Sequence, residues 1–469
     1  MTIELSTITF TNGADIVPES GEEAILNSGI ANTLAGNDTI TGMGPYDDYN
    51  PNNSGYGIYN TGTLNTAEGN DIITGTGDEV GIYNTGTLNT GEGKDIITGG
   101  KGGSPYASGI VNSGTFNTAE GDDIITGNGE RYGSAIGNSG TFNTGEGDDI
   151  ISAGGVNGGF FNSGTFNTAD GNDVITGSGA KSEGISIAKG STLDTGNGND
   201  SIRGSGLYTG IYNDSITFNT GDGNDTIQGT GGSTGIYNTG LINTGNGKDT
   251  IIAKGGTMNY YGADPGFSNF STIDTGNGED IITATGGIQN NGTIDTGDDD
   301  DIITGSGGFS YLGDDLSGID NKGTIDTGKG NDSIIAEGLS IGTDGTLNTG
   351  NGMDIITSSK AMDNGGTINT GDGADFIIAN GGFKGMGSVF LGNGKDYLNG
   401  FGTGKFNGGN NEDTLELTSG TYTVGISATT VSFTKSGVIM QTSEFEKLIA
   451  GSTTYNFTSL TDGQTIVVA

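Results

Sequence analysis

Sixteen aspartate residues recur along the chain in one sequence context, and their carboxylates are the side chains best suited to do chemistry. Each is followed two positions later by Ile or Leu, and fourteen are preceded two positions earlier by Gly. Hard oxygen ligands of this kind suit Ca²⁺. The candidate metal ligands are therefore Asp38, Asp71, Asp95, Asp123, Asp149, Asp173, Asp200, Asp225, Asp249, Asp280, Asp301, Asp332, Asp354, Asp375, Asp396 and Asp413.

Other kinds of chemistry are poorly represented. The 469 residues include no His and no Cys, which excludes disulfides, thiolate catalysis and most zinc chemistry. A Gly-x-Ser-x-Gly match around Ser233 has no histidine to activate its serine, and it lies in a Gly-rich corner. The many carboxylate pairs are explained by the repeat. We therefore expect that the protein is not an enzyme.

The net charge is −41, with 57 acidic and 16 basic residues, and it limits the kinds of molecule that the protein can bind. Phosphate binding needs clustered Lys and Arg, so we expect no nucleic-acid partner. No apolar run is long enough to span a bilayer, so we expect no membrane insertion. Residues 1–25 lack the cationic and apolar regions of a Sec-type signal peptide.

The elements that must position the aspartates are short strands. The aspartates lie 17 to 33 residues apart, and a typical unit, residues 81–99, reads GIYNTGTLNTGEGKDIITG. Three β-branched or aromatic pieces alternate with Gly-rich corners, and no apolar period of 3.6 residues is sustained. Such short strands bury themselves only by stacking coil on coil, about 4.8 Å apart. We expect an all-β, right-handed parallel β-solenoid of about 16 coils with three short strands per coil.

Two further positions repeat in register. Asn recurs eleven residues before many of the aspartates, as Asn60, Asn84 and Asn112 do, and we expect hydrogen-bonded amide ladders there. Thr stands eight residues before the Asp in twelve units, with Asn or Asp two positions later, as in Thr63 and Asn65. This Thr-x-Asn pattern is either plain strand chemistry or a flat array that binds ice.

The segment Thr90–Ile97, Thr-Gly-Glu-Gly-Lys-Asp-Ile-Ile, resembles the glycine-rich nonapeptide of the RTX (hemolysin-type) calcium-binding repeat proteins. The resemblance covers about residues 32–415 and implies Ca²⁺ held between stacked turns by Asp carboxylates and turn carbonyls. Two departures are clear: Thr replaces the first Gly, and the turn occurs once per coil rather than every nine residues. We therefore expect calcium along one edge only, with a dry hydrogen-bonded turn as the alternative.

The domain boundaries follow from where the repeat begins and ends. We expect an N-terminal cap at 1–30, the calcium-binding solenoid at 31–415, and a β-rich C-terminal cap at 416–469. Within the last, residues 422–424, 430–434 and 438–441 predict antiparallel strands, and 445–449 a short helix or strand. This tail resembles the C-terminal caps of RTX proteins, which implies an uncleaved secretion signal or a plain cap.

The function expected from these features is structural. We predict a secreted, extracellular protein of a surface layer, sheath, matrix or fibre, rigidified by Ca²⁺, whose partners are calcium ions and either further copies of itself or a surface polysaccharide. The alternatives are an ice-binding protein that uses the Thr and Asn ladders, and a carbohydrate-binding adhesin that uses tyrosines in polar inserts: Tyr46, Tyr49, Tyr106, Tyr260, Tyr261 and Tyr311.

Overall fold

The computed structural model describes residues 2–18, 24–44, 55–256, 264–307 and 317–469. It forms two compact units: unit 1 is Met1–Gly245 with Ile252–Lys254, and unit 2 is Asn246–Ile251 with Gly255–Ala469. The chain is an all-β parallel β-solenoid of about 15 turns, which confirms the predicted fold class. The described residues contain no α-helix and two short 3-10 turns, η1 (Leu5–Thr7) and η2 (Phe457–Ser459).

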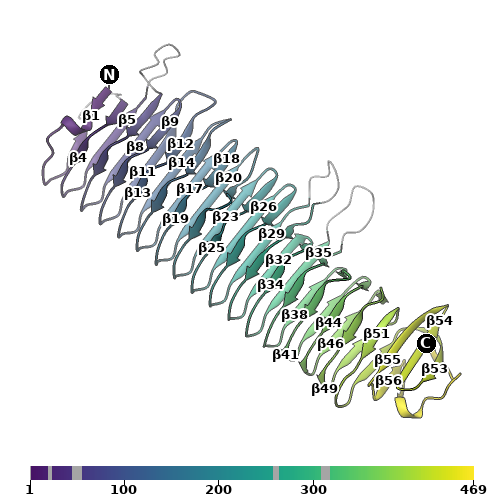
Figure 1. Cartoon of the computed structure of the whole chain (residues 1–469). Helices are drawn as coiled ribbons and strands as arrows, with labels where there is room; N and C mark the ends of the chain where they lie inside the picture. Colours follow the sequence, from purple (N-terminus) through teal and green to yellow (C-terminus); the bar gives the residue numbers. More distant parts are fainter. Residues whose placement is uncertain (1, 19–23, 45–54, 257–263, 308–316) are drawn as a thin grey trace. The chain divides into compact units, whose positions relative to one another are not determined.

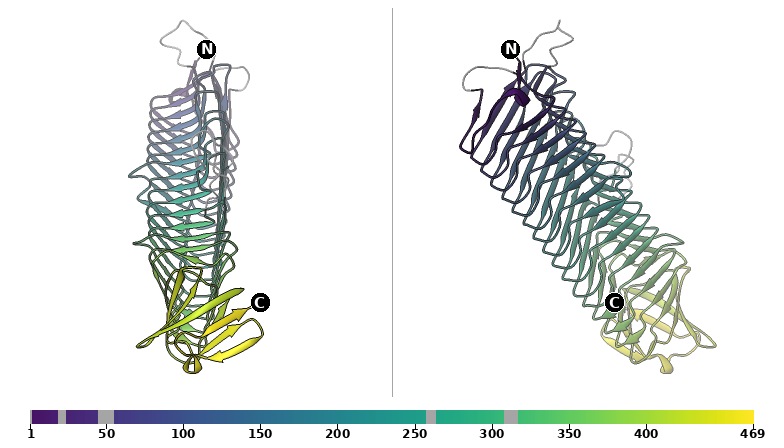
Figure 2. Two further views of the ribbon diagram at one scale, coloured as in Figure 1. Left: turned by 90° about the vertical axis from the view of Figure 1, so that its right-hand side faces the viewer. Right: turned by 60° about the vertical axis from the view of Figure 1, so that its left-hand side comes forward.

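In unit 1, each full coil adds one strand to each of three parallel sheets, named A, B and C (Figures 1 and 2). Sheet A holds β1 (Thr2–Glu4), β3 (Ala24–Asn27), β6 (Tyr56–Asn60), β9 (Val80–Asn84), β12 (Ser108–Asn112), β15 (Ser134–Asn138), β18 (Gly158–Asn162), β21 (Ile185–Ile187), β24 (Thr209–Asn213) and β27 (Thr234–Asn238). Sheet B holds β2 (Ile16–Val17), β5 (Thr39–Met43), β8 (Ile72–Gly77), β11 (Ile96–Lys101), β14 (Ile124–Gly129), β17 (Ile150–Gly155), β20 (Val174–Gly179), β23 (Ser201–Gly206) and β26 (Thr226–Gly231). Sheet C holds β4 (Ile30–Asn32), β7 (Thr63–Asn65), β10 (Thr87–Asn89), β13 (Thr115–Asn117), β16 (Thr141–Asn143), β19 (Thr165–Asn167), β22 (Thr192–Asp194), β25 (Thr217–Asn219) and β28 (Leu241–Asn243).

Unit 2 repeats the same arrangement, and β29 (Thr250–Lys254) is shared between the two units. Its sheet A holds β30 (Phe267–Asn269), β33 (Ile288–Asn290), β36 (Ile319–Asn321), β39 (Leu339–Ile341), β43 (Met362–Asn364) and β47 (Phe383–Lys384). Its sheet B holds β32 (Ile281–Gly286), β35 (Ile302–Gly307), β38 (Ser333–Ala336), β42 (Ile355–Ser358), β46 (Phe376–Ala379), β50 (Tyr397–Asn399), β52 (Thr414–Leu417), β56 (Lys447–Ala450) and β57 (Thr453–Asn456). Its sheet C holds β31 (Thr272–Asp274), β34 (Thr293–Asp295), β37 (Thr324–Asp326), β40 (Thr346–Asn348), β44 (Thr367–Asn369), β48 (Ser388–Phe390), β51 (Gly404–Asn407), β55 (Val438–Ser443), β54 (Thr430–Lys435), β53 (Gly420–Ser427) and β58 (Thr465–Val468), and a small sheet joins β41 (Asn351–Gly352), β45 (Asp372–Gly373) and β49 (Asn393–Gly394).

The core is a set of apolar ladders that run from coil to coil. Leu88 pairs in register with Leu64 on one side and Phe116 on the other, and all three side chains are fully buried. The rings of Phe116 and Phe142 stack with centroids 4.2 Å apart. Because each side chain packs on its equivalent in the next coil, burial of about 1.5–3 kcal/mol per large side chain accumulates along the ladder.

The turn before each aspartate depends on glycine. Gly93 has φ 143°, and a Cβ added there would lie 1.8 Å from the carbonyl oxygen of Gly69 in the preceding coil. Two of the sixteen turns have no Gly at this position. They place Asp299 (φ 90°) and Asn411 (φ 86°) in the same left-handed region. Asp and Asn tolerate that region better than other residues do, so these two exceptions in the sequence pattern retain the turn.

The C-terminal part of unit 2 changes from parallel to antiparallel pairing. β53 pairs with β54, β54 with β55, and β53 with β58, all antiparallel, which confirms the three strands predicted between residues 422 and 441. β55 and β56 also pair in parallel with the coil strands β51 and β52. Residues 447–450 therefore form a strand, which covers most of the segment predicted as a short helix or strand.

Candidate functional site

All sixteen predicted aspartates are buried, and in each unit they form one hydrogen-bonded row. In unit 1 the backbone N–H of Asp95 donates to Oδ1 of Asp123 at 2.7 Å, and the bond repeats coil by coil from Asp38 to Asp225 at 2.7–2.8 Å. In unit 2 the same bond links Asp249 through to Asp413 at 2.7–3.0 Å. One carboxylate oxygen per coil therefore holds the neighbouring coil's backbone.

The second carboxylate oxygen is in a different situation. Oδ2 of Asp95, Asp123, Asp149 and Asp173 is buried with no hydrogen-bond partner. In other coils the Thr five residues earlier donates to it: Thr327 Oγ1 lies 2.7 Å from Asp332 Oδ2. Burying a charged oxygen without a partner costs free energy. A proton or a cation bound to the row would remove this cost.

Burial shifts these groups toward the protonated form. Desolvation raises the pKa of Asp123 and Asp173 to about 8, although the nearby Thr118 and Thr168 hydroxyls and a backbone N–H group beside each carboxylate oppose the rise. The same cause raises the pKa of Asp301 to about 8 and that of Asp149 to about 7. A neutral carboxylic acid in such a row could donate from Oδ2 to the neighbouring Thr hydroxyl.

The same residues fit calcium in ligand type and charge. Calcium takes six to eight oxygen ligands, so one free carboxylate oxygen per coil would need Thr hydroxyls and turn carbonyls to complete a site. Within the described residues, no group of three or more Asp or Glu side chains is close enough to hold one metal ion. The row supplies buried, unpartnered oxygens on successive coils, and it is not a preassembled carboxylate centre.

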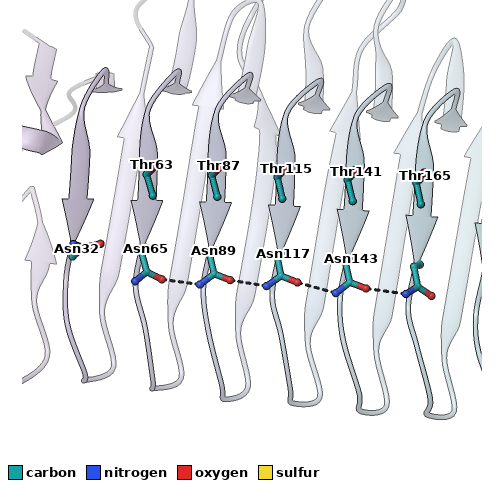
Figure 3. Close-up of a pocket in the computed structure, with 11 residues that line it drawn as sticks. Asn32, Thr63, Asn65, Thr87, Asn89, Thr115, Asn117, Thr141, Asn143 and Thr165 are labelled. Atoms are coloured by element: carbon teal, nitrogen blue, oxygen red, sulfur yellow. Dashed lines mark hydrogen bonds between the residues drawn. The ribbon is translucent and has the colours of Figure 1, made fainter.

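A second feature, on the outer face of unit 1, is a regular array of Thr and Asn. Outward Thr and Asn side chains of sheet C line one open depression, from β4 to β19 (Figure 3). The two rows, which we call the Thr–Asn array, contain Thr63, Thr87, Thr115, Thr141 and Thr165, and Asn65, Asn89, Asn117, Asn143 and Asn167. Strand pairing keeps each row in exact register from one coil to the next.

Hydrogen bonds fix the Asn row of this array. Nδ2 of Asn89, Asn117, Asn143 and Asn167 donates to Oδ1 of the Asn in the preceding coil at 2.7–3.0 Å (Figure 3). In the Thr row beside them, Thr63 and Thr87 are half-buried, and Thr115, Thr141 and Thr165 are exposed. The array therefore presents rigid amides and solvent-facing hydroxyl and methyl groups at one fixed repeat.

The inner amide ladder predicted from the sequence is also present. Nδ2 of Asn27, Asn60, Asn84, Asn112 and Asn138 donates to Oδ1 of the Asn in the following coil at 2.7–2.9 Å. Asn60 also donates to the backbone oxygen of Thr87 at 2.8 Å, which ties the corner to sheet C. These asparagines are completely or almost completely buried, so this ladder is structural.

Three successive coils of unit 2 carry acidic residues where most coils of unit 1 have amides. Asp274, Asp295 and Asp326 pair in register on successive strands of sheet C. Desolvation raises the pKa of Asp295, and the negative charges of Asp274 and Asp326 add to the rise. A carboxylate cannot donate as an amide does, so the neutral amide ladder is replaced by acids at these three coils.

Two contacts were not predicted from the sequence. The Thr five residues before fourteen of the sixteen aspartates is buried, and Thr66 Oγ1 donates to the backbone oxygen of Thr90 at 3.0 Å; its constant spacing was the available signal. Tyr106 stacks on Tyr132 with centroids 4.9 Å apart, a contact between coils that no sequence signal marks. The other tyrosines named as sugar-binding candidates, Tyr46, Tyr49, Tyr260, Tyr261 and Tyr311, lie outside the described residues.

Comparison with known proteins gives little beyond the architecture. No protein-family model matches the chain, and no curated protein matches it. Among solved structures the chain is similar to a hyperactive, Ca²⁺-dependent, β-helical antifreeze protein from an Antarctic bacterium, with 17% identity, a TM-score of 0.32, and coverage of 87% of this chain and 84% of that chain. Similarity at this level does not identify ligand-binding residues.

Proposed function

We propose that the protein binds ice through the Thr–Asn array of unit 1. The observation that carries the proposal is the Asn row, whose side chains are locked to one another at 2.7–3.0 Å beside an in-register Thr row. This was an alternative prediction from the sequence, and the geometry of sheet C favours it over a purely structural role.

The repeat of the array supports binding to an ordered water lattice. Neighbouring strands lie about 4.8 Å apart, and residues two apart on one strand lie roughly 6.6 Å apart. These spacings are of the same order as the oxygen repeats of ice. Because the Asn side chains are held by hydrogen bonds before any ligand arrives, ordering water on them costs little further side-chain entropy.

The chemistry of the array also suits ice. Ten residues from Thr63 to Asn167 offer hydroxyl, amide and methyl groups and no charge. A charged side chain would hold its own hydration shell against the lattice. The acids at Asp274, Asp295 and Asp326 make the equivalent surface of unit 2 a poorer candidate.

Thermal hysteresis and the shaping of ice crystals test this proposal. Thr141→Glu places a charge in the exposed Thr row and should reduce hysteresis several-fold. Thr126→Glu makes the same change on sheet B and should leave hysteresis at the wild-type value. Absence of hysteresis in the wild-type protein, or equal hysteresis in Thr141→Glu, would contradict the proposal.

We propose, as a second function, that the aspartate rows bind Ca²⁺ and rigidify a secreted, extracellular protein. The specific support is the unpartnered Oδ2 of residues such as Asp95 and Asp123, which a divalent cation would neutralise. The sixteen aspartates, the adjacent Thr hydroxyls and turn carbonyls would be its ligands. We propose no catalytic activity, since the chain lacks His and Cys and these aspartates are buried.

Calcium titration of chelator-treated protein tests the second proposal by calorimetry and thermal melting. Binding with a rise in melting temperature is expected near pH 8, where the aspartates are most in need of a counter-charge. Identical melting with calcium and with chelator would favour a neutral, protonated row. Neither result depends on the thermal-hysteresis experiment.

A further inference from the structure

The outer face of sheet B in unit 1 is a regularly repeating surface that neither proposed function uses. From β8 to β20 its outward side chains include two long rows, and the strands pair in register throughout. The first row contains the apolar residues Ile72, Ile96, Ile124, Ile150 and Val174. The second contains Thr74, Thr98, Thr126, Ser152 and Thr176.

The first row is unusually exposed for large aliphatic side chains. Ile72, Ile96 and Ile150 are 41%, 37% and 42% exposed. Their neighbours in the row are equivalent positions on adjacent strands, so the exposure forms one continuous apolar ridge rather than scattered residues. A contiguous patch of this kind is typical of a surface that contacts another macromolecule.

The face also lacks charge in a chain whose net charge is −41. The outward positions of β5, β8, β14, β17 and β20, and Ile96, Thr98 and Gly100 of β11, are neither acidic nor basic; β11 ends at Lys101. The exposed acids lie instead at the bordering turns, as Glu92, Glu120 and Glu146 do. Two copies can therefore bring these faces together without placing like charges inside the contact.

We infer that this face of sheet B pairs with the same face of a second copy of the chain. The rows repeat at the same strand spacing in both copies, so the ridges of one can lie in the grooves of the other, as an isologous contact requires. Six strands of up to six residues give a face of roughly 30 Å by 20 Å. Two copies would bury roughly 1,200 Å², at the low end for a specific interface, so the dimer should be weak and reversible.

The acidic turns at the border give this association a distinctive salt dependence. They approach one another as the faces meet, and their repulsion is screened by salt. Burial of the apolar ridge is not weakened by screening. Self-association should therefore strengthen as sodium chloride is raised, the reverse of an ion-paired interface.

Sedimentation velocity of the full chain, over a range of concentration and sodium chloride, tests the inference. Thr126→Glu puts a carboxylate at the centre of the face and should weaken dimerisation roughly tenfold or more. Ile96→Thr keeps a β-branched residue and should weaken it several-fold. Thr141→Glu, the same change on sheet C, is the matched control and should dimerise as the wild type does, with folding of all variants checked by circular dichroism.

The outcomes separate this inference from ice binding. Thr126→Glu should weaken dimerisation and keep thermal hysteresis, whereas Thr141→Glu should reduce thermal hysteresis and keep dimerisation. A wild-type protein that stays monomeric at millimolar concentration and high salt would overturn the inference. So would a folded Ile96→Thr variant that dimerises with unchanged affinity, or equal losses in Thr126→Glu and Thr141→Glu.

Discussion

The backbone N–H of Asp95 donates to Oδ1 of Asp123 at 2.7 Å, so one residue type supplies both the donor and the acceptor of a bond that repeats between coils. This bond uses one carboxylate oxygen of Asp123 to join two coils. The other, Oδ2, is buried and has no hydrogen-bond partner. The aspartate row is thus required by the fold and strained by its charge at the same time.

Replacement of Asp123 separates the two oxygens. Asp123→Ala removes the acceptor for the Asp95 N–H and should cost about 1–3 kcal/mol of stability. Asp123→Asn keeps an acceptor oxygen and removes the charge, so in chelator near pH 8 it should be at least as stable as the wild type. Thermal melting of the three proteins measures this, and an Asn variant as unstable as the Ala variant would show that the charge itself is needed.

Stability in chelator should fall as pH rises. Burial raises the pKa of Asp123 and Asp173 to about 8 and that of Asp71 and Asp375 to about 6, whereas an unfolded Asp titrates near about 4. The folded state therefore binds protons more tightly than the unfolded state, and protonation stabilises it. These groups contribute most below about pH 4, and the contribution is lost as pH rises through about 6 to 8.

Melting curves in chelator between about pH 5 and pH 9 follow this dependence, and added calcium should restore stability at the alkaline end. A melting temperature that rises with pH in chelator would contradict the raised pKa values. A loss that calcium does not reverse would argue for protons rather than metal as the natural counter-charge.

The acidic stretch of sheet C in unit 2 offers a stabilising substitution. Asp295 lies in register between Asp274 and Asp326, and the three carboxylates repel one another. Asp295→Asn removes that repulsion and supplies an amide donor toward its neighbours, so stability should rise by about 0.5–1 kcal/mol. Asn117→Asp in unit 1 makes the opposite change, breaks the bond to Asn89, and should lower stability by about 1 kcal/mol.

The turn glycines should be far less tolerant than their neighbours. Gly93→Ala would place a methyl group 1.8 Å from the Gly69 oxygen and should lower the melting temperature markedly or prevent folding of nearby coils. Ala67 has φ 65° in the same kind of turn, so Ala67→Gly relieves a left-handed residue and should be neutral or stabilising by about 1 kcal/mol. Circular dichroism melts of the two variants compare them directly.

Much of the fold follows from the sequence because stacking coils share a register. The spacing from Leu88 to Asp95 to Ile97 predicts which residues lie in the core, and all three are fully buried. The inner ladder through Asn60 and Asn84 was predictable for the same reason. The order of the strands and the number of sheets can be inferred from the repeat. The antiparallel C-terminal strands can be inferred from the point where the repeat stops.

The partners of individual oxygens were not predictable in this way. The sequence places Asp95 beside Asp123 and leaves open which oxygen meets a backbone N–H, because that depends on the pitch of the coil and the rotamer of the side chain. The exposed Ile ridge of sheet B was also missed: Ile96 and Ile97 are adjacent and equally apolar, yet one is 37% exposed and the other is buried. Only the pleat of the strand distinguishes them.

The two amide ladders of unit 1 run in opposite directions: Asn60 donates toward the following coil, whereas Asn89 donates toward the preceding one. Each aligned row of amides carries an electric dipole along its length, and two antiparallel rows largely cancel. An added coil thus extends both rows by one bond each without building up potential at either end. The two amide rows therefore set no limit on coil number, and the protein's length can change by whole repeats through duplication or deletion of the coding segment.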